Sequence, residues 1–211
     1  MRITLIQPSR GRPEQARKAL FNWKLLASAS SFPHRHILSL DADDDKIEQY
    51  RQAFSDCDGL MIVGDNRTMV DALNACLPHL PESGPVVTLF DDMVPSDNWN
   101  VAISNGYQPG KLLKADCGTP LQTICAGCSS VFKRWGYIYY PGYISMYADN
   151  DYQEHAELEK LFANCELRMS HNHPAHGTAE TDATYQRQNH MAAYKLGERI
   201  LTRRRACGFA Y

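Results

Sequence analysis

Three pairs of aspartates are spaced so that both members of a pair could serve one site. They are Asp41 and Asp43, Asp91 and Asp92, and Asp149 and Asp151. Neighbouring carboxylates can hold a hard divalent cation or accept a proton from a substrate. Each pair would also suit a polar turn or a helix cap, where short acidic side chains are favoured. Both interpretations stay open until the neighbouring elements are considered.

A histidine cluster near the C-terminus could supply further metal ligands. Residues 171–177 read His-Asn-His-Pro-Ala-His-Gly. If the strand before this cluster continues into it, His171 and His173 lie on the same side, so either could reach a cation. His173 is preferred because it precedes a proline and is therefore expected to be extended. A polar surface loop and a zinc site made by three histidines are the alternatives.

Several familiar phosphate and metal motifs are missing from the chain. There is no GxxxxGK[ST] sequence and no GxGxxG after the first apolar run, which argues against P-loop enzymes and dehydrogenases. Residues 41–52 do not form a calcium loop, because Lys46 and Gln52 replace the required glycine and glutamate. Cys125 and Cys128 have CxxC spacing without a second pair, so reduced and largely buried thiols are expected among the seven cysteines.

Charge and hydropathy limit the possible partners. The net charge of −2 does not indicate a polyanionic partner for the whole molecule. Residues 195–211 differ, because they carry Lys195, Arg199 and the arginines of 203–205 against a single carboxylate, that of Glu198. They could bind phosphates or form a solvated helix end. The sequence has no apolar run of about 18 residues and no secretory signal, so a soluble cytoplasmic protein without a membrane partner is expected.

The first ninety residues predict a parallel sheet that would bring the acidic pairs together. Expected strands at 2–6, 36–40, 60–63 and 86–90 alternate with expected helices that start at 13, 44 and 68. Such sheets bind ligands beyond the carboxyl ends of their strands. Polar clusters follow each of the four strands, at 7–12, 41–45, 64–67 and 91–92. This coincidence is the most informative pattern in the sequence.

The second half of the chain is less regular. Helices are expected at 96–106, 129–134, 149–162 and 182–205, and strands at 111–114, 121–126 and 166–170. Residues 135–147 contain six aromatic side chains in thirteen positions. These rings would suit core packing, or alternatively a platform on which an acceptor stacks.

Five motifs, taken in chain order, resemble glycosyltransferase family 2 and its relatives of the GT-A fold. They are Gln-Pro-Ser-Arg-Gly-Arg-Pro at 7–13, Leu-Asp-Ala-Asp at 40–43, Asn66-Arg67 with Ala72-Leu-Asn74, Leu-Phe-Asp-Asp-Met at 89–93, and Tyr-Ala-Asp-Asn-Asp at 147–151. The resemblance covers residues 2–175, and Phe90 departs from the usual first acidic position of the DxD motif. The chain is also similar to small bacteriophage glycosyltransferase-like proteins that are linked to DNA base modification.

The resemblance implies a fold, a domain plan and a set of site residues. The fold would be α/β, a Rossmann-like GT-A domain with a mostly parallel sheet flanked by helices and a less regular C-terminal acceptor half. Its single domain would comprise a nucleotide-sugar half at 1–93, an acceptor half at 94–180 and a basic helix at 181–211. The implied donor contacts are Pro8, Ser9, Arg10, Arg12, Asp41, Asp43, Arg67, Asn74 and Asp91. Asp92, with His173 or His171, would bind Mn²⁺ or Mg²⁺, and Asp151, or else Asp149, would be the general base.

The expected activity is transfer of a sugar from a nucleotide diphosphate sugar, a uridine one, to a hydroxyl group. The diphosphate that leaves carries charge, and without a P-loop a carboxylate-bound cation would neutralise it. The acceptor could be a hydroxymethylated pyrimidine in phage DNA, in the host cytoplasm, with residues 203–205 on backbone phosphates. The alternatives are a nucleotidyltransferase, whose glycine-rich loop is missing here, and a non-catalytic module that binds nucleic acid and holds zinc with Cys117, Cys125, Cys128 and His173.

Overall fold

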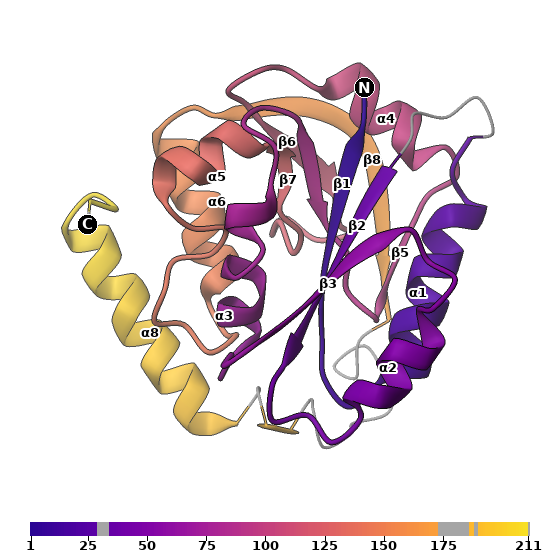
Figure 1. Cartoon of the computed structure of the whole chain (residues 1–211). Helices are drawn as coiled ribbons and strands as arrows, with labels where there is room; N and C mark the ends of the chain where they lie inside the picture. Colours follow the sequence, from indigo (N-terminus) through magenta and orange to yellow (C-terminus); the bar gives the residue numbers. More distant parts are fainter. Residues whose placement is uncertain (29–33, 173–185, 188–189, 211) are drawn as a thin grey trace.

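The N-terminal half of the chain alternates strands and helices as its sequence predicts. The computed structural model describes residues 1–28, 34–172, 186–187 and 190–210 (Figure 1). The first elements are β1 (Ile3–Ser9), α1 (Pro13–Leu25), β2 (His34–Asp41), α2 (Ile47–Ala53), β3 (Gly59–Gly64), α3 (Met69–Asn74), the 3₁₀ helix η1 (Leu77–His79) and β4 (Pro85–Thr88). Pro13 occupies the first turn of α1, where its missing N–H has no intrahelical partner to lose.

The C-terminal half adds short strands and four helices among the described residues. They are β5 (Met93–Pro95), α4 (Trp99–Gly106), β6 (Leu112–Asp116), β7 (Ala126–Cys128), α5 (Ser129–Trp135), α6 (Ala148–Leu158), β8 (Phe162–His171) and α8 (Met191–Ala206). None of the helices in the described ranges is both long and apolar enough to cross a membrane.

The strands of the described residues join one eight-stranded sheet in the order β3-β2-β1-β4-β7-β6-β8-β5. The four strands of the N-terminal half run parallel, β6 and β8 are also parallel, and β7 and β5 are antiparallel to their neighbours. The carboxyl ends of β1, β2, β3 and β4 therefore lie along one edge of the sheet, which gathers the polar clusters that follow them. This mixed, mostly parallel α/β architecture confirms the expected fold class.

Helices cover both faces of the sheet. In Figure 1, α1 and α2 lie on one side of the central strands, and α3, α5, α6 and α8 lie on the other. The two cores meet at β1, where Leu5 packs in the cluster of Trp23 and Ile6 packs in the cluster of Tyr152. Every residue of β1 is buried, which explains why its sequence is not a polar and apolar alternation.

Three expected elements of the second half were wrong in their bounds. Residues 121–125 are not a strand, because the Gln122 side chain occupies the place of one: its amide accepts a hydrogen bond from the Ala115 nitrogen and donates one to the Ala115 oxygen. The helix expected to reach 162 ends at Leu158, just before Lys160 adopts a φ of 54°. The strand expected at 166–170 begins earlier, at Phe162.

The C-terminal helix starts later than expected, at Met191 rather than at 182. His190 caps this start, because its side chain accepts a hydrogen bond from the Ala193 nitrogen. Residues 182–185 and 188–189 lie outside the described part of the chain.

Candidate functional site

A pocket of about 240 Å³ opens at the carboxyl ends of the parallel strands. Ten of the residues predicted from the sequence line it: Pro8, Ser9, Arg10, Arg12, Asp41, Arg67, Asp91, Asp92, Asp149 and His171. Asp43, Asn74 and Asp151 lie outside its lining, and His173 lies outside the described residues. The pocket therefore brings together side chains from four strand ends and from the first turn of α6.

One end of the pocket is an ion-paired corner between β1 and β2. Nη1 of Arg10 lies 2.8 Å from Oδ2 of Asp41, and Arg10 also bonds the exposed carboxylate of Asp43. Burial raises the pKa of Asp41, against the opposing effect of Arg10. Asp43 thus acts from outside the pocket by holding Arg10, while Asp41 is the carboxylate of the pair that lines it.

Asp91 lines the pocket and is held by protein donors. The Gln7 amide donates to Oδ1 over 3.3 Å, and the Ser9 hydroxyl donates to Oδ2 over 3.4 Å. Burial raises the pKa of Asp91 to about 7, although the charge of Arg12 and the two hydrogen bonds favour the ionised form. Both oxygens are engaged within the protein, so Asp92 is the better placed carboxylate of the pair for a cation.

Asp92 and His171 converge because β5 pairs with the end of β8. Met93 lies opposite His171 in this antiparallel ladder. The backbone nitrogen of Asn172 donates a hydrogen bond to the backbone carbonyl oxygen of Asp92 over 2.8 Å. Nε2 of His171 lies 3.3 Å from Oδ2 of Asp92. Metal bonds of about 2.1 Å at roughly a right angle separate two ligand atoms by about 3 Å, so the pair fits one divalent cation.

The pair is too small to enclose a cation by itself. Among the described residues, no group of three or more His, Cys, Asp or Glu side chains could hold a metal ion. Such a two-residue site is typical of cations that take their remaining ligands from water and substrate phosphates. Cys117, Cys125 and Cys128 are buried free thiols and belong to no such group in the described part.

Asp149 and Asp151 point to different environments. Asp149 lines the pocket, and burial raises the pKa of its carboxyl. The Asp151 carboxylate is 1% exposed and pairs with Arg204 of α8, with Nε lying 3.0 Å from Oδ2. Residues two apart on a helix do not share a face, so only one of the two can reach the pocket. The structure therefore places Asp149 in the pocket lining and pairs Asp151, the first choice for the general base, with Arg204.

Asn74 supports the pocket indirectly. Its side-chain amide donates a hydrogen bond to the backbone carbonyl oxygen of Tyr139 over 2.8 Å. The same amide accepts hydrogen bonds from the backbone nitrogens of Ile138 and Tyr139. This clamp fixes the aromatic segment, whose Tyr139 lines the pocket. Asn74, which was expected beside the nucleotide, lies outside the pocket lining and supports a residue that lines it.

Eleven further lining residues were not among the predicted site residues, although several belong to the motifs or to the aromatic stretch at 135–147. They are Thr68, Met69, Ala72, Phe90, Met93, Thr123, Tyr139, Ser145, Met146, Ala148 and Arg187. Most are apolar or small, so their types alone suggest packing. Arg187 is the exception: its guanidinium lies 4.0 Å from the Asp41 carboxylate and donates to the Arg67 oxygen over 3.4 Å. Its charge is the only signal that could have indicated it.

Comparisons with known proteins support the fold at low sequence identity. No protein-family model matches the chain, and no curated protein is similar enough in sequence to match. S. aureus TarS residues 1–349 in complex with UDP aligns with a TM-score of 0.62 and 13% identity, over 81% of this chain and 60% of that one. The mannosyltransferase PcManGT from Pyrobaculum calidifontis, in complex with GDP-Man and Mn²⁺, aligns with a TM-score of 0.59 and 11% identity, over 97% and 75%.

The similarity places the chain in a structural class. The chain shares its α/β fold with these two proteins, in agreement with the fold that the sequence motifs implied. The chain spans 36% of the whole S. aureus TarS chain and 60% of the TarS fragment that binds UDP.

Proposed function

We propose that the protein transfers a sugar from a UDP-sugar to a hydroxyl acceptor, with Mn²⁺ or Mg²⁺ held by Asp92 and His171. The observation that carries this proposal is the convergence of these two side chains on a pocket that the Arg10–Asp41 ion pair also lines. Such a pocket suits a donor with a nucleoside at one end and a charged diphosphate at the other. UDP, GDP-Man and Mn²⁺ in the structural neighbours agree with it.

Different residues of the pocket have different roles in the proposed reaction. A bound cation would neutralise the charge that builds up on the departing diphosphate. Asp41 and Arg10 bind the nucleoside, and Arg12 and Arg67 offer cationic side chains to the diphosphate. Asp149 removes the proton from the acceptor hydroxyl as its oxygen bonds to the anomeric carbon. The bond from that carbon to the diphosphate oxygen breaks, and the nucleoside diphosphate leaves with the bonding electrons.

Binding of UDP tests the donor site. Calorimetric titration of UDP into the protein should give binding that requires Mn²⁺, because Asp92 and His171 provide only two of the ligands and the diphosphate completes the set. Binding in Mn²⁺ and its loss in EDTA are the expected result. If no uridine, guanosine or thymidine diphosphate binds with either cation, the donor assignment is wrong.

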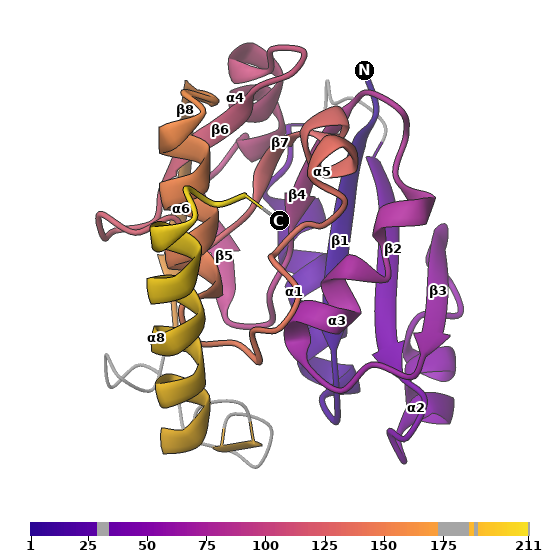
Figure 2. The ribbon, with the colours of Figure 1, turned by 90° about the vertical axis from the view of Figure 1, so that its left-hand side faces the viewer.

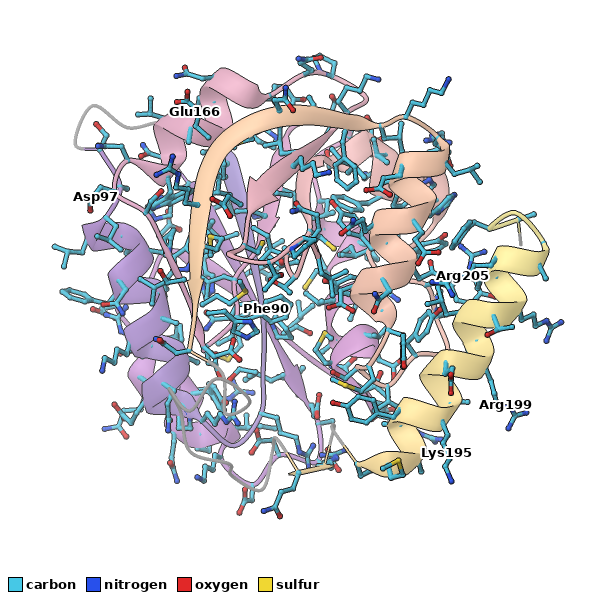
Figure 3. All side chains as sticks on the ribbon, turned by 180° about the vertical axis from the view of Figure 1, so that it is seen from behind. Phe90, Asp97, Glu166, Lys195, Arg199 and Arg205 are labelled. Atoms are coloured by element: carbon cyan, nitrogen blue, oxygen red, sulfur yellow. The ribbon has the colours of Figure 1, made fainter. Side chains whose placement is uncertain are left out.

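For the acceptor we propose a hydroxymethylated pyrimidine in DNA, supported by a cationic row on α8. The arginine cluster expected on phosphates is divided by the structure: Arg204 is buried, and Arg205 is ion-paired with Glu154. Lys195, Arg199 and Arg203 remain exposed, four residues apart and hence on one side of the helix. In Figure 3 the labelled Lys195 and Arg199 project away from the body of the protein.

The salt dependence of DNA binding tests this acceptor. We expect binding of an oligonucleotide that contains 5-hydroxymethylcytosine to weaken steeply with salt, with a log–log slope reduced by about 1 for each cation removed. Lys195→Ala and Arg199→Ala should each reduce the slope. Arg205→Ala changes the net charge equally but removes a cation already paired with Glu154, and should leave the slope closer to that of the wild type. Absence of binding at low salt would exclude this acceptor.

A further inference from the structure

The C-terminal helix α8 lies directly against the pocket wall that contains Asp149. Figures 1 and 2 show α8 alongside α6 on the side of the molecule away from α2. Residues 145–149 comprise the end of the aromatic segment at 135–147 and the first two residues of α6. Ser145, Met146, Ala148 and Asp149 all line the pocket. The position of this wall therefore depends on what supports it from behind.

Gly197 allows a close approach between α8 and the wall. A Cβ atom at this position would lie 2.4 Å from the Met146 oxygen and 2.9 Å from Cδ2 of Tyr147. Such distances require the backbone to move, since the nearest atom belongs to a peptide group. Glycine is a poor helix former, so its presence within a sixteen-residue helix is explained by this contact. One turn earlier, the ring of Tyr194 packs edge-on against Tyr147.

Arg204 fixes the same wall through a buried ion pair. Its side chain is 3% exposed and binds Asp151 in the first turn of α6, and the Tyr143 hydroxyl donates to the same Asp151 oxygen over 3.1 Å. The guanidinium also lies 3.9 Å from the centre of the Tyr140 ring. Because Asp151 is held from behind, the helix turn is oriented so that Asp149 reaches the pocket.

The donor end of the pocket has separate support. Asp41 and Asp91 accept hydrogen bonds from Arg10, Gln7 and Ser9, all of which belong to β1 or the residue after it. We propose that Gly197 and Arg204 are positioning residues: α8 sets the placement of Asp149 and the acceptor wall without determining donor affinity. The expected loss of turnover rests on the proposed transfer reaction, whereas the expected displacement of the wall does not.

Gly197→Ala separates acceptor-side positioning from donor binding. The added methyl group favours the helix intrinsically but forces α8 away from Met146, so the wall and Asp149 shift. A displacement of about 1 Å at a reacting group can lower the rate about 100-fold. We expect UDP release from the UDP-sugar that the wild type uses best to fall by about that factor, whereas Mn²⁺-dependent UDP affinity stays within about twofold.

Hydrogen exchange at residues 146–151 provides a readout independent of activity. The backbone amide of Ala148 donates to the carbonyl oxygen of Ser145, and that of Asp151 donates to the carbonyl oxygen of Tyr147. Hydrogen exchange at both amides should therefore accelerate in Gly197→Ala. Glu198→Ala, at the adjacent exposed position, is the matched control and should behave as the wild type. Tyr194→Ala removes a ring that is 43% exposed and contacts Tyr147, and should shift both readouts in the same direction but less.

Three outcomes would overturn the proposal. The first is unchanged exchange at 146–151 in both Gly197→Ala and Tyr194→Ala. The second is unchanged UDP release in Gly197→Ala. The third is a loss of UDP affinity as large as the loss of turnover, which would indicate general disruption. If the wild type binds no nucleoside diphosphate, the proposed function fails, and the exchange measurement alone decides whether α8 positions the wall.

Discussion

Replacement of Asp92 by alanine is expected to abolish Mn²⁺-dependent UDP binding and to lower sugar transfer by roughly 1,000-fold. A cation that neutralises a departing diphosphate contributes several kcal/mol to transition-state stability, and this fold-change corresponds to about 4 kcal/mol. Asp92 supplies the carboxylate of the two-residue site, and His171 alone leaves a single imidazole that cannot fix the cation. Calorimetry with UDP and Mn²⁺, together with UDP release from a UDP-sugar, measures both effects.

His171→Ala should have the same effect on metal-dependent binding, because it removes the other half of the pair. Asn172→Ala is the matched control, because Asn172 directly follows His171 and its side chain is exposed. The variant keeps the backbone nitrogen that donates to the carbonyl oxygen of Asp92. Wild-type UDP affinity in Asp92→Ala, in the presence of Mn²⁺, would contradict the assignment of this metal site.

The parallel half of the sheet could be predicted because local patterns determine it. Apolar runs at β1, β2, β3 and β4 are each followed by polar residues, and Pro13 marks the start of α1 where the structure has it. The topology of a parallel sheet then gathers the carboxyl ends without further information. This reasoning gathers residues 7–12 and 41–45 at one edge of the sheet, whereas the choice of Pro8, Arg10 and Asp41 as donor contacts came from the resemblance of the motifs.

The acceptor side could not be resolved from the sequence because it depends on contacts between distant segments. The partner of Asp151 is Arg204, 53 residues away, and no local pattern distinguishes the aspartate that meets it from the one that faces the pocket. The convergence of His171 with Asp92 likewise depends on the register of β5 against β8, and the three-residue β5 was not predicted. Gln122 shows the same limit, since its side chain replaces a strand that its neighbours favour.

The two aspartates of α6 should respond to the same substitution in opposite ways. Asp149→Asn removes the proposed base, and loss of general base catalysis lowers rates by about 10²–10⁴-fold. Burial raises the pKa of Asp149, which means that its charge costs stability in the folded protein, so the neutral amide should not destabilise the fold. UDP affinity with Mn²⁺ should persist, because the side chains assigned to the nucleoside and the cation, those of Arg10, Asp41 and Asp92, are unchanged.

Asp151→Asn instead leaves the Arg204 guanidinium buried without its counter-charge. Breaking a buried ion pair in this way costs about 3–5 kcal/mol, so urea unfolding should shift to much lower concentrations. Any loss of turnover in this variant should follow the loss of folded protein, whereas in Asp149→Asn turnover is lost from a stable fold that still binds UDP. A stable but inactive Asp151→Asn beside an active Asp149→Asn would reverse the assignment, because it would require Asp151 to leave Arg204 and enter the pocket during the reaction. The buried pair, 1% and 3% exposed and further bonded by Tyr143, opposes that movement.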